Sequence, residues 1–95
     1  MENNEYIKVN VMFFGDLRNL TGTRQKEITT KKGVKLSDLL TLLEQEYHFS
    51  FKNYIEDNKG IRILINGQEY ERLGGINALL GDEFTVVFFP ALFGG

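Results

Sequence analysis

The chain has 95 residues, of which 42% are hydrophobic and 25% charged, with a formal net charge of −2. These values are typical of one soluble globular domain, and they exclude an intrinsically disordered chain. The sequence contains no cysteine, which excludes disulfides, thiolate metal sites and cysteine nucleophiles.

The first element is expected over residues 7–14, where apolar side chains alternate with a period of two. This pattern predicts a strand with one buried face. The residues of that face are Ile7, Val9, Val11 and Phe13. Met12 and Phe14 are expected to point to the opposite face.

A short helical turn is expected next, because residues 15–22 begin and end in turn residues and Leu17 and Leu20 are three apart. The turn should end at Gly22, and both leucines should lie in the core. A second, more polar strand is expected over residues 24–29. The two strands would then form a wide hairpin around the helical turn.

The only long helix is expected from Leu36, since apolar residues then recur at helical spacing. They are Leu36, Leu39, Leu40, Leu43 and Tyr47. Lys35 is a poor N-cap, but Ser37 and Asp38 supply a hydroxyl and a negative charge to the first turn. One face of this helix should therefore pack on the sheet.

Residues 48–60 hold aromatic side chains without a clear period and are interpreted as an irregular surface segment. His48, the only histidine, lies at the expected end of the helix. It is interpreted as a C-terminal helix residue rather than a ligand or base. Adjacent carboxylates elsewhere in the chain lack a nearby histidine or cysteine, so no metal site is predicted.

Two further strands complete the expected sheet. Residues 61–65 form the third, and the Asn66-Gly67 pair is a strong hairpin signal that leads into residues 68–70. Residues 84–89 form the last strand, which stops at Pro90 because proline cannot donate to a ladder. This order of elements predicts an α+β fold with a mixed four- to five-stranded sheet and one main helix across it.

Four segments carry a resemblance to a known family. They are Phe13-Phe14-Gly15-Asp16-Leu17-Arg18-Asn19-Leu20-Thr21-Gly22, Ile65-Asn66-Gly67, Gly81-Asp82-Glu83, and Val86 to Pro90 followed by Gly94-Gly95. Their order resembles the MoaD/ThiS family of ubiquitin-like sulfur carriers. The paired Phe and the Phe-Pro ending are most similar to MoaD, the small subunit of molybdopterin synthase. The resemblance implies a ubiquitin-like β-grasp domain over residues 1–90 and a flexible C-terminal Gly-Gly tail over residues 91–95.

The resemblance also implies what the tail would do. An E1-like enzyme would use ATP to adenylate the Gly95 carboxylate, which would become a thiocarboxylate with sulfur from a donor protein. The large subunit of molybdopterin synthase would then receive the tail and the sulfur for molybdenum cofactor biosynthesis. The chain would be a non-catalytic, sulfur-donating subunit that binds no cofactor itself.

Simple chemistry agrees with a Gly-Gly end. A carboxylate is a poor electrophile until it is activated, and the activating site must exclude water, so Gly94 and Gly95 suit a narrow channel. Residues 91–95 would reach about 17 Å if fully extended. The alternative is that the glycines are a frayed end without function. Ala91-Leu92-Phe93 departs from the small, proline-rich residues expected in MoaD.

A partner surface is predicted near the root of the tail. Phe14, Phe89 and Met12 would form an exposed apolar patch if they face away from the core, and such patches commonly mark interfaces. The full set of predicted partner-binding residues is Phe14, Phe89, Pro90, Met12, Leu92 and Phe93. The resemblance places the partner contact at Phe14 and Phe89.

Several classes of partner and location are not expected. The Lys/Arg residues are scattered, which makes a poor nucleic-acid surface. The first residues lack the pattern of a signal peptide, and no apolar stretch approaches the length of about 20 residues that spans a membrane. A cytoplasmic protein is therefore predicted.

Three alternatives to the MoaD interpretation remain open. In the first, Gly95 is activated but is joined to lysines of target proteins, as in a ubiquitin-like modifier. In the second, the chain is a ThiS-like carrier for another acceptor. In the third, it is a non-covalent interaction module whose tail has no chemistry.

Overall fold

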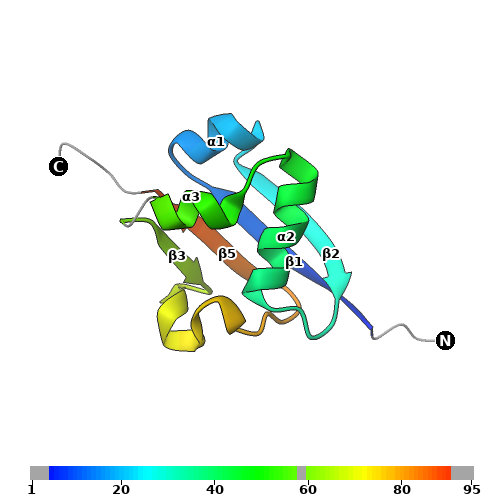
Figure 1. Cartoon of the computed structure of the whole chain (residues 1–95). Coiled ribbons are helices and arrows are strands. Elements are labelled where there is room, and N and C mark those ends of the chain that lie inside the picture. Colours follow the sequence, from blue (N-terminus) through cyan, green and yellow to red (C-terminus); the bar gives the residue numbers. More distant parts are fainter. Residues whose placement is uncertain (1–4, 58–59, 91–95) are drawn as a thin grey trace.

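The computed structural model describes residues 5–57 and 60–90. The strands are β1 (Tyr6–Phe13), β2 (Gln25–Lys31), β3 (Arg62–Ile65), β4 (Gln68–Glu69) and β5 (Phe84–Phe89). The helices are α1 (Asp16–Thr21), α2 (Leu36–Tyr47) and α3 (Phe51–Asp57), with short 3-10 helices η1 (Tyr70–Leu73) and η2 (Gly75–Asn77). Figure 1 shows α2 lying across the sheet, with α1 and α3 near one end of it.

The sheet has five strands in the order β2-β1-β5-β3-β4. The central pair, β1 and β5, is parallel, and the other neighbours are antiparallel. This confirms the predicted α+β fold with a mixed sheet and one main helix. β5 has the predicted bounds, and the turn before β4 has φ of 51° at Asn66 and 84° at Gly67, as a tight hairpin requires.

One hydrophobic core lies between the sheet and the helices. Its fully buried large side chains are Phe13, Phe51, Phe88, Leu17, Leu36, Leu39, Leu40, Leu43, Ile63, Ile65, Val9 and Val11. Three of the four residues of the predicted β1 face and four of the five of the predicted α2 stripe are among them; Ile7 is also buried, and Tyr47 is half-buried against the core. Both predicted faces are therefore confirmed. Burial of these side chains is the main force that holds α2 on the sheet.

The ends of α2 are set by one carboxylate and one residue with positive φ. The Asp38 carboxylate accepts a hydrogen bond from the Lys35 N–H at 2.9 Å, which supports the first turn despite the poor N-cap. His48 has φ of 58° and donates its N–H to the Glu44 carbonyl at 2.8 Å. The predicted structural role of His48 at the helix end is confirmed.

Two predictions about local structure are wrong. Part of the segment predicted to be irregular is α3, in which Phe51 is buried and Tyr54 and Ile55 pack against the core at helical spacing. Leu20 is not in the core, because α1 is only six residues long and turns only Leu17 inward. Leu17 is fully buried, whereas Leu20 is 48% exposed.

We expect Ser50→Ala to lower the free energy of unfolding by about 1 kcal/mol. The Ser50 hydroxyl accepts a hydrogen bond from the Asn53 N–H at 3.2 Å at the start of α3, and alanine would leave that N–H without its cap. Urea unfolding measures the change. Ser50→Asp, which retains an acceptor at this position, should unfold close to the wild-type midpoint. Equal losses in both variants would contradict a capping role.

Candidate functional site

The predicted partner surface lies where β1 and β5 end. Because these strands are parallel, their carboxyl ends meet at the same edge of the sheet. Phe14 and Phe89 are stacked there, with ring centroids 4.7 Å apart and ring planes at 28°. Phe14 is 38% exposed, while its neighbour Phe13 is fully buried, so the two adjacent aromatics do face opposite ways.

The strand register extends this surface across the face of the sheet that carries no helix. Met12 lies beside Val87 of β5, and Val87 lies beside Leu64 of β3. All three side chains are half-buried. The apolar surface therefore comprises Met12, Phe14, Leu64, Val87, Phe89 and Pro90.

Val87 and Leu64 were not among the residues predicted for this surface. The alternation of β5 carried the signal for Val87, because Val86 and Phe88 are buried on the other face. Leu64 needed the register between β3 and β5, which the sequence does not give. Beyond Leu64, Arg62 donates hydrogen bonds to the Glu69 carboxylate and forms an ion pair with it. The apolar surface thus has a charged border on the β3–β4 side.

The end of β5 is held against the loop between β1 and α1. The Phe14 N–H donates to the Phe88 carbonyl at 3.1 Å. Gly15 has φ of +65°, and a Cβ added to it would lie 3.2 Å from Cγ of Pro90. Glycine therefore serves two needs here, the left-handed backbone and the close approach of the proline ring. Pro90, the last residue of the described range, is thereby fixed beside Phe14 and Phe89.

α3 is tied to α1 close to this loop. The Tyr54 hydroxyl donates a hydrogen bond of 2.7 Å to Oδ1 of Asp16. Burial raises the pKa of Tyr54 above its ordinary value, and the hydrogen bond to Asp16 and its charge raise the pKa further. The proton of the phenol is thus held more tightly in the folded protein than in the unfolded chain.

We expect Tyr54→Phe to lower the free energy of unfolding at neutral pH by about 1 kcal/mol, since it removes this hydrogen bond. A raised folded-state pKa stabilises the fold below the unfolded pKa of about 10, and that contribution is lost as the pH rises above it. The variant should therefore lose less stability than wild type between about pH 8 and about pH 11. Urea unfolding at both pH values is the measurement. A loss of stability equal to that of wild type would exclude Tyr54 as a source of alkaline destabilisation. Some loss should remain in the variant, because Tyr47 and Tyr70 also have raised pKa values.

Part of the predicted site falls outside the described residues. Gly94, Gly95, Leu92 and Phe93 belong to residues 91–95, which the structure does not describe, so their predicted roles stay predictions. Within residues 5–57 and 60–90, no group of three or more His, Cys, Asp or Glu side chains could hold a metal ion. The helices found in that part of the chain are too short or too polar to cross a membrane.

Comparison with known proteins gives matches over nearly the whole chain. The model of the ThiS family matches residues 11–95. Small archaeal modifier protein 3 of Haloferax volcanii is 28% identical over 92 residues, covering 94% of this chain and all of that protein.

Two solved structures match both the fold and the sequence. Small archaeal modifier protein 1 of Methanosarcina acetivorans is 30% identical with a TM-score of 0.74, covering 97% of this chain and 100% of its own. A Pyrococcus furiosus protein, provisionally described as molybdopterin converting factor, subunit 1, is 27% identical with a TM-score of 0.73. That alignment covers 90% of this chain and 99% of the other. These neighbours have the ubiquitin-like β-grasp fold that was predicted for this chain.

Proposed function

The chain belongs to the ThiS family of ubiquitin-like proteins, and on that premise we propose that it carries sulfur as a thiocarboxylate on Gly95. The observation that best supports this function is the position of the apolar surface at the end of β5. A partner that binds Phe14 and Phe89 would contact the chain next to Pro90, the residue that precedes the tail of residues 91–95. The described domain would bind the partner, and the tail would carry the sulfur.

The chemistry requires an activating enzyme. A Gly95 carboxylate oxygen would attack the α-phosphorus of ATP, forming the acyl adenylate and releasing pyrophosphate. Hydrosulfide delivered by a donor protein would then attack the acyl carbon, displace AMP and leave the thiocarboxylate with loss of one proton. ATP would bind to the E1-like partner, whose closed site would protect the adenylate from water.

We propose that the protein that receives the tail and its sulfur is the large subunit of a molybdopterin synthase. The two proteins would act in the synthesis of molybdenum cofactor in the cytoplasm. The paired aromatics at positions 13 and 14 and the Phe89-Pro90 ending support this choice, as does the likeness to the Pyrococcus furiosus protein. The chain would supply the sulfur as the small subunit, while catalytic groups would come from the large subunit.

A second candidate function is a protein modifier joined through Gly95 to lysine amines. Two relatives support it, since both are described as small archaeal modifier proteins. The bulky Leu92-Phe93 before the Gly-Gly end also departs from the pattern expected of MoaD. The activation step is the same, and only the nucleophile that attacks the adenylate or thiocarboxylate differs.

Intact mass of the protein purified from its native host tests the proposal. Replacement of one carboxylate oxygen by sulfur adds about 16 Da, and fragmentation must place the gain on Gly95 because methionine oxidation adds the same mass. A thiocarboxylate on Gly95 supports the carrier. Isopeptides between Gly95 and lysines, without a thiocarboxylate, would favour the modifier. If neither product is found in cells that are synthesising the cofactor, the remaining interpretation is a non-covalent interaction module.

A further inference from the structure

The outer edge of β2 carries unpaired backbone groups. β2 is the first strand of the sheet and has only β1 beside it. The Phe13 N–H donates to the Arg24 carbonyl at 2.9 Å. The Lys32 N–H donates to the Glu5 carbonyl at 2.8 Å. Hydrogen-bonded and non-hydrogen-bonded residue pairs alternate along an antiparallel ladder. The even-numbered residues from 24 to 32 therefore direct their backbone N–H and C=O groups toward β1. The odd-numbered residues therefore direct their N–H and C=O groups outward.

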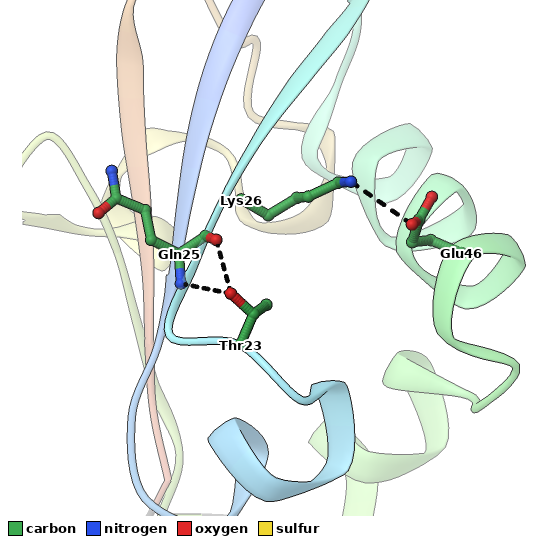
Figure 2. Close-up of polar contacts among 4 residues, drawn as sticks. All are labelled: Thr23, Gln25, Lys26 and Glu46. Atoms are coloured by element: carbon green, nitrogen blue, oxygen red, sulfur yellow. Dashed lines mark hydrogen bonds and ion pairs between the residues drawn. The ribbon is translucent and has the colours of Figure 1, made fainter.

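One end of this edge is already closed. The Thr23 hydroxyl donates to the Gln25 carbonyl at 2.9 Å and accepts from the Gln25 N–H at 3.3 Å, as Figure 2 shows. The next outward positions are Glu27, Thr29 and Lys31. Apart from the β1–β2 ladder, no hydrogen bond found within residues 5–57 and 60–90 involves a backbone N–H or C=O group of these three residues. The open part of the edge thus spans residues 27–31, about the length of an average strand.

A groove of about 370 Å³ runs beside this edge, between β2 and α2. Its apolar lining residues are Ile28 and Leu42, which are both half-buried. Two of its charged lining residues form an ion pair, in which the Lys26 ammonium on β2 and the Glu46 carboxylate on α2 lie 3.4 Å apart (Figure 2). The groove can therefore take an apolar side chain near Ile28 from a segment lying along β2.

The other end of the edge is basic. Lys31 ends β2, and Lys32 and Lys35 follow it. The two ion pairs found in the described part of the chain join Lys26 to Glu46 and Arg62 to Glu69, so these three lysines take part in neither. Such a cluster attracts carboxylates, and it disfavours partners that are themselves basic.

We propose that the outer edge of β2 binds an extended acidic peptide segment of a partner protein, which adds to the sheet as a sixth strand. The peptide backbone pairs with residues 27–31, as in other cases of strand addition. One apolar side chain enters the groove over Ile28 and Leu42, and carboxylates lie beside Lys31 and Lys32. This site is separate from the Phe14–Phe89 surface and does not depend on Gly95 chemistry.

Titration of the isotope-labelled full-length chain with a synthetic peptide tests the proposal. The peptide has alternating valine and threonine residues and ends in a run of aspartates. We expect saturable amide shift changes in residues 27–31 and in α2 near Leu42, with slower hydrogen exchange at the Thr29 N–H. A matched peptide ending in lysines should bind at least about fivefold more weakly. No saturable binding of the acidic peptide, or equal binding of both, would overturn the proposal.

Thr29→Pro removes one outward N–H without removing a ladder bond to β1, and edge strands tolerate proline in this position. We expect it to weaken binding by about tenfold or more, whereas Thr29→Ala, which keeps the N–H, should bind within about twofold of wild type. Unchanged binding by a folded Thr29→Pro variant would overturn strand addition, as would shift changes confined to the Phe14–Phe89 surface. If circular dichroism shows that Thr29→Pro is unfolded, Lys31→Glu decides, with an expected loss of about fivefold. Self-association through this edge, detected by sedimentation and lost in Lys31→Glu, would assign it to a second copy instead.

Discussion

Deletion of Gly95 is expected to lower the rate of adenylate formation by at least about 100-fold without changing the stability of the fold. The reacting carboxylate would then belong to Gly94 and would lie about 3.5 Å short of its position along an extended tail. A displacement of that size removes the alignment on which attack at the α-phosphorus of ATP depends. Among residues 5–57 and 60–90, none beyond Phe88 belongs to the core, so we expect the thermal midpoint to stay the same. Pyrophosphate exchange with the E1-like enzyme measures the rate.

A surface variant at the far end of β5 serves as the control. Leu79 is 65% exposed and lines a pocket with Asn66 and Phe84, at the opposite end of the strand from Pro90. Leu79→Ala should therefore retain full pyrophosphate exchange. Normal exchange after deletion of Gly95 would reject the carrier and the modifier together, because both need the same activated carboxylate. Loss of exchange in Leu79→Ala would instead indicate that the enzyme reads a second surface.

Sequence periodicity was sufficient for β1 and α2, because each of them buries one of its faces in the core. Their buried residues recur at period two in β1 and at helical spacing in α2. α3 has the same kind of stripe in Phe51, Tyr54 and Ile55, and Ser50 provides an N-cap acceptor. The interpretation as an irregular segment missed it because the helix has only seven residues and follows the left-handed residue His48 closely.

The alternation within one strand predicted which way the side chains of the candidate site face, and the resemblance predicted that Phe14 and Phe89 share a surface, but the contacts made between aligned strands were not predictable. Period two was enough to turn Phe14 away from Phe13. The stack of Phe14 on Phe89, however, depends on the parallel pairing of β1 and β5, which brings together residues far apart in the sequence. A contact between residues so far apart in the chain leaves no pattern in the local sequence around either of them. The contact of Gly15 with Pro90 is hidden for the same reason.

Phe13→Ala is expected to lower the free energy of unfolding by about 3–5 kcal/mol. The side chain is fully buried, and its ring lies 5.8 Å from that of Phe88, 5.9 Å from Tyr47 and 6.0 Å from Phe51. It thus joins β1 to β5, α2 and α3, and alanine would leave a cavity where these elements meet. Since small domains have only about 5–15 kcal/mol in total, part of the variant should be unfolded at growth temperature. Urea unfolding followed by circular dichroism measures the loss.

Phe14→Ala is the matched control, because it removes the same side chain from the next residue on the opposite face. It should cost only about 1 kcal/mol, the order of one exposed aromatic pair, since its main partner is the half-buried Phe89. Its effect should appear in affinity for the E1-like enzyme, with a loss of about tenfold or more if the ring is an anchor of the interface. Equal costs of unfolding in the two variants would contradict the opposite facing of these rings. Unchanged affinity in Phe14→Ala would show that this partner binds elsewhere, even with the fold intact.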